Sequence, residues 1–129
     1  MVEQMLVSIL RQGGVLIASI HEALDDDEIV RFQKDLVEQI GSYRAHGVII
    51  DVAALDVLDS FASRTLRDLA HAARLRGAET VIVGIQPAVA LAMVRLGTGL
   101  DGVHTTLDLE EGLEYLRRLQ AGRHQPTTP

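Results

Sequence analysis

The chain has no cysteine and no tryptophan among its 129 residues, and it has only two phenylalanines and two tyrosines. Without cysteine there is no disulfide framework, no thiolate metal site and no cysteine nucleophile. A chain of this kind fits a reducing compartment. The scarcity of aromatic side chains argues against a single-stranded nucleic-acid surface built on base stacking.

An excess of positive charge is also missing, because 12 Lys and Arg stand against 18 Asp and Glu, for a formal net charge of -6. An acidic domain gains no counterion-release energy, so nucleic acid is not an expected partner. No apolar run approaches the roughly 18 residues that span a bilayer, and Val48–Ile50 ends at Asp51. Glu3 and the lack of an A-x-A site argue against a signal peptide in Met1–Gln12. We therefore expect a cytoplasmic protein without a membrane partner.

The amino-terminal half shows first the period of strands and then that of a helix. Met5–Leu10 and Val15–Ile20 are short β-rich runs separated by Gly13-Gly14, which predicts a hairpin. The acidic cluster Asp25–Glu28 precedes a helical stripe, and we interpret it as a helix cap rather than a metal site because no second ligand group is near. The stripe that we expect to be buried consists of Ile29, Phe32, Leu36 and Ile40.

A different kind of strand follows. Val48–Val52 is almost continuously apolar, as expected for a strand that is covered on both faces. Ala53–Asp59 is predicted to be a loop, and Ser60 is predicted to be the N-cap of the next helix. The buried stripe of that helix is expected to contain Ala62, Leu66, Leu69 and Ala73.

The carboxyl-terminal half repeats the alternation. Thr80–Ile85 is a second buried strand, and Val103–Leu107 is a short one. Pro87–Leu96 is a helix that is apolar nearly all round, so we expect it to be largely covered. Asp108 and Glu111 match a capping box for the last helix, whose apolar residues are Leu109, Leu113, Leu116 and Leu119.

The order β-β-α-β-α-β-α-β-α predicts one α/β domain with a mostly parallel mixed sheet, an N-terminal β-hairpin and four helices. A chain of this length can bury about 68% of its unfolded surface, which is sufficient for one core. We place the domain at residues 1–122. The polar tail at residues 123–129 contains two prolines and is expected to be disordered.

The sequence contains no set of residues typical of an enzyme. Gly97–Gly102 matches G-x-G-x-x-G, but it follows a helix and leads into a strand, so it is an αβ loop rather than a dinucleotide site. The five histidines form no i, i+4 metal pair. No serine lies in a G-x-S-x-G elbow. We therefore expect no catalytic residue, no metal and no cofactor.

The segment Leu55–Phe61 lies between a buried strand and an amphipathic helix, at the rim where ligands and partners of parallel sheets bind. From spacing alone, Ser60 is either a helix cap or a hydroxyl that accepts a phosphate, and both interpretations remain open. Ser63 and Thr65 are possible alternative acceptors, less exposed than Ser60. A partner surface on this segment and helix is predicted to include Asp56, Asp59, Phe61, Arg64 and Arg67.

Three segments carry a resemblance to a known family: Gly47–Asp51, Leu55–Phe61, and Gly84–Ala90 running on to Leu96-Gly97. The pattern over residues 5–120 resembles a STAS domain (sulphate transporter and anti-sigma factor antagonist), and within that family the RsbS-type scaffold proteins of the stressosome. In that family the serine of the D-S-F segment is phosphorylated by an RsbT-type serine kinase, and this position is Ser60 here.

The resemblance further implies a large assembly with an RsbR-type co-antagonist. This assembly holds the kinase until phosphorylation releases it, and a PP2C-type phosphatase resets the serine. RsbR-type proteins carry an N-terminal sensor domain, for which this chain has no room, and a second phosphorylatable threonine, where this chain has Ala92. Anti-anti-sigma factors continue their D-S with a small pair, whereas Phe61-Ala62 follows here. The alternative is an anti-sigma factor antagonist that binds an anti-sigma kinase.

Overall fold

The chain begins with the expected hairpin, in which β1 (Val7–Gln12) pairs antiparallel with β2 (Val15–Ile20). Gly13 turns the chain with a φ of 60°, in the left-handed region that favours glycine. The computed structural model describes residues 6–123, so the predicted start of the first strand at Met5 lies outside the described residues. The strand that is described ends at Gln12, two residues later than predicted.

The remaining strands are parallel to β2 and follow the order of the sequence across the sheet. They are β3 (Gly47–Asp51), β4 (Glu79–Val83) and β5 (His104–Thr106), and the sheet order is β1-β2-β3-β4-β5. β3 is central, with β2 and β4 as its two hydrogen-bonded neighbours. The predicted strand content and the mixed sheet are confirmed.

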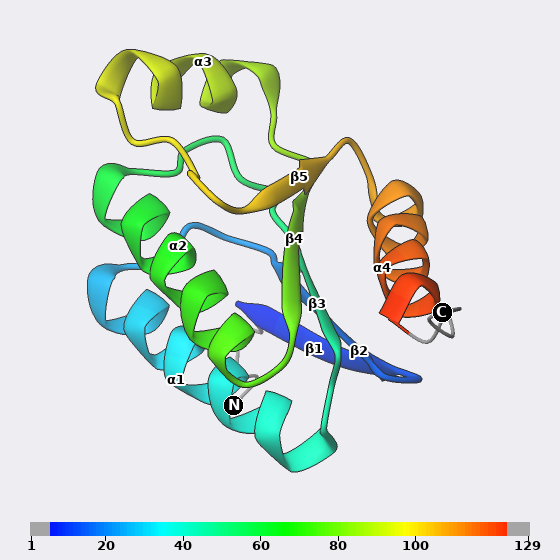
Figure 1. Cartoon of the computed structure of the whole chain (residues 1–129). Coiled ribbons are helices and arrows are strands. Elements are labelled where there is room, and N and C mark those ends of the chain that lie inside the picture. Colours follow the sequence, from blue (N-terminus) through cyan, green and yellow to red (C-terminus); the bar gives the residue numbers. More distant parts are fainter. Residues whose placement is uncertain (1–5, 124–129) are drawn as a thin grey trace.

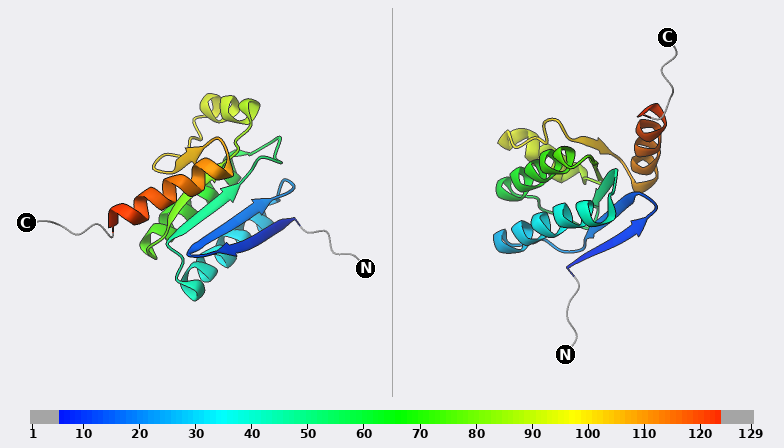
Figure 2. Two further views of the ribbon diagram at one scale, coloured as in Figure 1. Left: turned by 90° about the vertical axis from the view of Figure 1, so that its right-hand side faces the viewer. Right: turned by 60° about the horizontal axis from the view of Figure 1, so that its bottom comes forward.

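Helices cover both faces of this sheet (Figure 1). α1 (Asp26–Tyr43) and α2 (Ser60–Leu75) lie side by side on one face, and α4 (Leu109–Arg123) lies on the other (Figure 2). α3 (Pro87–Leu96) stands beyond the end of the sheet, next to β5. The four helices and the element order agree with the sequence prediction.

The core consists of two clusters separated by the sheet. The predicted stripes of α1 and α2 are all buried against one face. Leu116 of α4 packs on the other face with Ile49 and Val81. β3 therefore contributes to both clusters: Val48 and Ile50 belong to the first, and Ile49 belongs to the second.

The expectation that α3 is covered is wrong. Val89 and Met93 are its only buried residues, whereas Leu91, Val94 and Leu96 are exposed. The physical reason is its position, because no element of the described chain lies over its outer side (Figure 1). Hydropathy reports which side chains prefer burial, but it does not tell whether the same chain supplies the covering surface.

The amino-terminal cap of α1 lies in the acidic cluster, as the sequence indicates. Asp25 is the N-cap of α1 and forms a reciprocal capping box with Glu28. At α4 only half of the predicted box forms: Asp108 Oδ1 accepts from Glu111 N (2.9 Å), but Glu111 Oε2 accepts from Leu107 N (3.2 Å) rather than from the amide of Asp108. Gly97–Gly102 connects α3 to β5, as expected for an αβ loop.

Of the predicted tail at residues 123–129, only Arg123, the last residue of α4, belongs to the described residues. Between residues 6 and 123, no helix is long and apolar enough to cross a bilayer.

Candidate functional site

The carboxyl end of β3 leads into the segment 52–60, which we call the Ser60 loop. Three buried side chains anchor it: Val52 at its start, and then Leu55 and Leu58. Its start is fixed by two hydrogen bonds: Val52 N donates to Val83 O (3.0 Å), and Ala53 N donates to Asp51 Oδ1 (2.9 Å). The loop is therefore held at both ends, and the residues between its anchors project at the rim of the sheet.

The cap of α2 differs from the sequence prediction. Asp59, not Ser60, is the N-cap, and its Oδ1 accepts a hydrogen bond from Ala62 N (2.8 Å). Ser60 is the first helical residue. A carboxylate is also the better partner for the positive end of the helix dipole. The prediction that Ser60 caps the helix is wrong, because its neighbour provides the same hydrogen bond with a charged acceptor.

Because Asp59 caps the helix, the hydroxyl of Ser60 is not needed as a cap. Ser60 is half-buried, and within the described residues its Oγ has no hydrogen-bond partner. The two alternative acceptors differ sharply from it. Ser63 is 1% exposed and Thr65 is 7% exposed, and the Thr65 hydroxyl donates to Phe61 O (2.8 Å). Of the three hydroxyls, that of Ser60 is the most accessible to an enzyme.

Charged side chains of both signs lie in the Ser60 loop and on the first two turns of α2. Asp56 and Asp59 are exposed in the loop. Arg64 lies one helical turn after Ser60, is exposed, and has no ion-pair partner among residues 6–123. Arg67 is half-buried, and its Nε lies 4.0 Å from Asp68 Oδ1. The structure thus brings the predicted charged residues to the loop and the first turns of one helix.

Phe61 has a different role from the charged residues. It is half-buried and packs against the larger core cluster. Its side chain anchors the first turn of α2 to the body of the domain.

One contact of the loop was not found from the sequence. Gln86, the N-cap residue of α3, donates from Nε2 to Ala53 O (2.8 Å). This bond ties the start of α3 to the Ser60 loop. The available signal was positional, because the carboxyl ends of adjacent parallel strands meet at one edge and both segments follow such ends.

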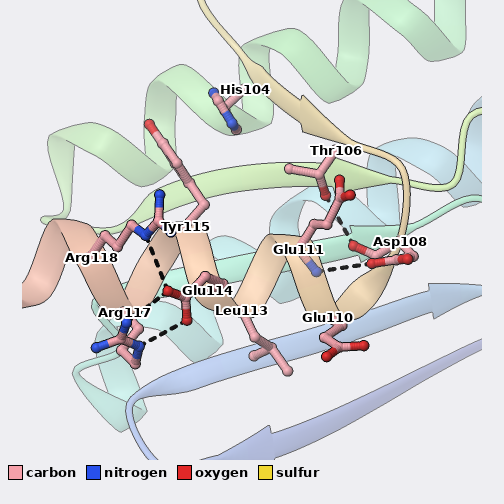
Figure 3. Close-up of a pocket in the computed structure, with 10 residues that line it drawn as sticks. All are labelled: His104, Thr106, Asp108, Glu110, Glu111, Leu113, Glu114, Tyr115, Arg117 and Arg118. Carbon is pink, nitrogen blue, oxygen red and sulfur yellow. Dashed lines mark hydrogen bonds and ion pairs between the residues drawn. The ribbon is translucent and has the colours of Figure 1, made fainter.

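A separate depression of about 940 Å³ lies between α4 and β5 (Figure 3). His104 and Tyr115 stack beside it, with ring centroids 3.6 Å apart. Several of its polar side chains already bind one another or the backbone: Glu111 Oε2 accepts from Leu107 N (3.2 Å) as part of the cap of α4. The depression therefore has the polar contacts of a helix start rather than a set of groups converging on a substrate.

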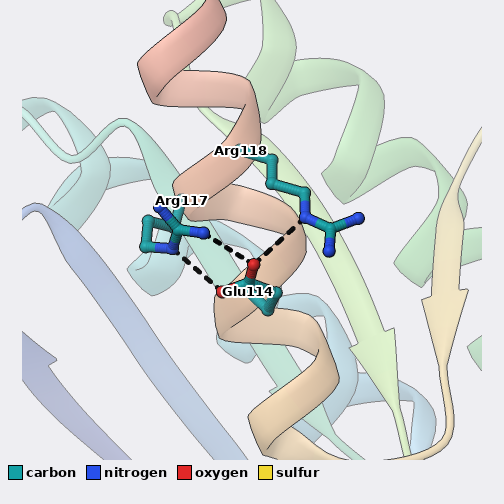
Figure 4. A network of polar contacts seen from close by, with 3 residues as sticks. All are labelled: Glu114, Arg117 and Arg118. Atoms are coloured by element: carbon teal, nitrogen blue, oxygen red, sulfur yellow. Dashed lines mark hydrogen bonds and ion pairs between the residues drawn. The ribbon is translucent and has the colours of Figure 1, made fainter.

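The ion-pair network on α4 is shown in Figure 4. Arg117 binds Glu114 through two hydrogen bonds (2.7 and 2.9 Å), and Arg118 Nε donates to the same carboxylate (3.1 Å). These hydrogen bonds to Arg117 and Arg118 lower the pKa of Glu114 from 4.5 to about 2. The network is exposed, so it is sensitive to salt.

Comparisons with known proteins agree with this architecture. The family model of the STAS domain matches residues 7–111. Among curated proteins, the RsbT co-antagonist protein RsbRA of Bacillus subtilis is 29% identical over 91 residues, which are 70% of this chain and 33% of that protein. The chain thus spans about a third of the length of this relative.

Two solved structures are similar over nearly their whole length. A variant of RsbS from Moorella thermoacetica, with a serine replaced by glutamate, has a TM-score of 0.77 and 34% identity, covering 89% of this chain and 97% of that one. A chain from a solved structure of the stressosome, which is described as a signal integration and transduction hub, has a TM-score of 0.75 and 35% identity. The match covers 88% of this chain and 98% of that one.

The capping assignment predicts that substitutions of two adjacent residues change the stability by different amounts. Asp59→Ala should lower the free energy of unfolding by about 1 kcal/mol, because the amide of Ala62 loses its acceptor. Ser60→Ala should change it by less than about 0.5 kcal/mol. Urea denaturation measures both, and Asp59→Asn is the control that keeps an acceptor. A larger loss for Ser60→Ala than for Asp59→Ala would contradict the assignment.

The network on α4 predicts a pH dependence. Because the folded-state pKa of Glu114 is about 2, below the ordinary 4.5, its contribution to stability is present above pH 4.5 and is lost as the pH falls through about 2. Carboxyl NMR should find the Glu114 midpoint near pH 2, and the double variant Arg117→Gln/Arg118→Gln should move it toward 4.5. Arg95→Gln is the control. A midpoint that does not move in the double variant would contradict the network.

Proposed function

We propose that this chain, which belongs to the STAS domain family, is a non-catalytic scaffold of the RsbS type that holds a serine kinase and releases it when Ser60 is phosphorylated. One observation carries the proposal. The Ser60 hydroxyl lies at the start of a helix on an anchored rim loop, and the neighbouring Asp59 provides the cap in its place.

The fold is expected to tolerate the phosphate. A phosphoserine adds about -1.5 to -2 charges. At a helix N-terminus the dipole and the free amides favour an anion by about 0.3 to 2 kcal/mol, whereas Asp56 and Asp59 oppose it through like charge. Arg64 follows Ser60 at i+4, the spacing at which an acid and a later base attract. These opposing contributions leave little net change in the stability of the domain.

A covered surface responds differently. When a partner buries the loop, an uncompensated ion costs several kcal/mol. Each 1.4 kcal/mol is a factor of about ten in affinity. A partner carboxylate that pairs with Arg64 before modification also loses that contact, because the phosphate competes for the same guanidinium. Phosphorylation therefore acts on binding more than on shape.

The proposal includes the partners of such a scaffold: an RsbR-type co-antagonist, an RsbT-type kinase, a PP2C-type phosphatase and further copies of the chain in a large assembly located in the cytoplasm. The similarity to RsbRA, itself described as an RsbT co-antagonist, and to a chain of the stressosome supports the co-antagonist and the large assembly.

The electrostatic mechanism is tested by titrating the cognate kinase against three proteins. Ser60→Ala should bind within about threefold of wild type, whereas Ser60→Asp should bind at least tenfold more weakly, because one added charge is buried at the interface. Ser42→Asp, which adds a carboxylate on exposed α1, is the matched control. Equal affinities of Ser60→Ala and Ser60→Asp would contradict the mechanism.

Mass spectrometry after incubation with kinase and ATP accompanies that titration. It should find one phosphate on Ser60, with Ser63 and Thr65 unmodified because both are buried. Phosphate on Ser63 alone would assign the switch to another residue.

Gel filtration distinguishes the scaffold from an anti-sigma factor antagonist. Mixed with an RsbR-type co-antagonist, the chain should elute in a particle far larger than a dimer. An anti-sigma factor antagonist would stay small and would bind an anti-sigma kinase instead, and that result would favour the alternative.

A further inference from the structure

One end of this acidic chain is basic. The segments 7–20, 39–50 and 69–78 contain no Asp or Glu, although the whole chain has 18 acidic residues and a net charge of -6. The arginines of these segments are Arg11, Arg44, Arg74 and Arg76. The first two segments are joined by a hydrogen bond from His46 N to Gly14 O (2.8 Å). The second and third are joined where Glu79 N, directly after the third, donates to His46 O (3.0 Å).

These segments meet where α1 and α2 end, at the side of the domain away from α3 (Figure 1). A depression of about 560 Å³ lies there, between the last turns of the two helices. Its polar side chains are those of Arg44, His46 and Arg76, and its lining contains no Asp or Glu. We call the surface formed by these three residues the basic edge.

The two arginines of the basic edge lack a counter-charge within the described chain. Arg44 and Arg76 are exposed, and neither guanidinium forms an ion pair or a hydrogen bond with residues 6–123. Arg74 differs, because it pairs with Glu79 (3.2 Å) and donates to Gly102 O (2.9 Å). Two like charges that line one depression repel each other, so a carboxylate supplied from outside is attracted by both.

Glycines make room for these side chains. Arg76 follows the last residue of α2, and its guanidinium lies over Gly41 in the last turn of α1, where a Cβ would collide with it. Gly14 makes room in the same way for the imidazole of His46, which a Cβ at position 14 would also meet. The positions of both cationic side chains therefore depend on neighbours without a side chain.

Arg44 occupies its place against its backbone preference. It ends α1 with a φ of 51°, in the left-handed region. Glycine or asparagine is usual at such a helix end, and another residue is strained there. Strained residues of this kind concentrate at positions that contact ligands. The strain at Arg44 thus points to a role for its guanidinium outside the fold.

Apolar surface lies beside the charge. Leu75 lines the depression and is 90% exposed. Tyr43 is exposed next to Arg44, and Arg11 Cζ lies 4.7 Å from the centroid of its ring. Arginine and tyrosine are enriched among the residues that contribute most to protein interfaces.

We propose that the basic edge binds a short acidic segment of a partner protein, in which two or three carboxylates lie next to an apolar side chain. The carboxylates pair with Arg44 and Arg76, and the apolar side chain packs on Leu75. Exposed Glu38 on α1 and Asp68 on α2 bound the edge, so it is short. A nucleic acid is a continuous polyanion that would run on to these carboxylates, whereas a short segment avoids them.

The basic edge is separate from the Ser60 loop. α2 begins at Ser60, and its 16 residues span about 24 Å, so Arg76 lies at the far end of the helix. This separation exceeds the Debye length of about 8 Å at physiological ionic strength. The inference therefore adds a second binding surface to the proposed scaffold, and it holds or fails independently of the switch.

Fluorescence anisotropy of a labelled peptide, with three glutamates flanked by leucines, tests the surface with the whole chain and no kinase. Arg44→Gln/Arg76→Gln should raise the dissociation constant at least fivefold, because both carboxylate contacts are lost. Arg31→Gln/Arg95→Gln removes the same charge from exposed positions elsewhere and should stay within about twofold of wild type. Added salt should weaken wild type more than the Arg44→Gln/Arg76→Gln variant. Circular dichroism confirms that each variant is folded.

Gly41→Ala tests the geometry without changing the charge. The added Cβ displaces the guanidinium of Arg76, whose flexible side chain can move, and alanine is the better helix former. The variant should therefore unfold at the wild-type temperature or higher, while its affinity for the peptide falls at least twofold.

Four results would overturn the surface: wild type that does not bind the peptide at millimolar concentration, an unchanged affinity in Arg44→Gln/Arg76→Gln, an equal loss in Arg31→Gln/Arg95→Gln, or equal binding of a peptide with glutamine in place of glutamate. Tighter binding of an oligothymidylate, lost in the Arg44→Gln/Arg76→Gln variant, would assign the edge to nucleic acid instead. Displacement of the peptide by an equal concentration of pyrophosphate would assign it to a small anion.

Discussion

The burial of β3 on both faces is the constraint on which the site depends. Val48, Ile49 and Ile50 are fully enclosed between α1 and α2 on one side and α4 on the other, and neighbouring strands take the backbone groups of β3. The side chains along a strand in this position are covered, so β3 can contribute to a functional site only where it ends. The Ser60 loop occupies that end, and its buried leucines transmit the rigidity of the sheet to the residues between them.

Three neighbouring residues of the site have different roles. Asp59 supplies the hydrogen bond and the charge that begin α2, and Phe61 anchors the first turn to the core. Ser60 lies between them, and its side chain has no structural role of this kind. A residue whose side chain contributes little to stability can be modified without unfolding the domain, which is what a reversible chemical switch requires.

The order of elements was predictable because each element has its own hydrophobic period and its own start or end signal: the paired glycines of the hairpin, the stripe of α1, and the N-terminal cap of α4 at Asp108. Three features were not predictable, for different reasons. Asp and Ser are both good caps, so an adjacent pair leaves the choice to backbone geometry. The apolar composition of α3 indicates burial, but no local pattern tells whether the covering surface comes from the same chain. The bond from Gln86 to Ala53 depends on the sheet bringing two loops together.

That bond from Gln86 joins two parts of the rim. In the Ser60 loop the carbonyl of Ala53 is the acceptor, and at the start of α3 the side-chain amide of Gln86 is the donor, 2.8 Å away. Linkage between binding events is reciprocal. If clustering of subunits favours one arrangement of this bond, the binding free energy of a partner on the loop changes by the same amount. In the proposed scaffold, the side-chain amide of Gln86 would in this way make the affinity for the partner of the loop depend on how many subunits have assembled.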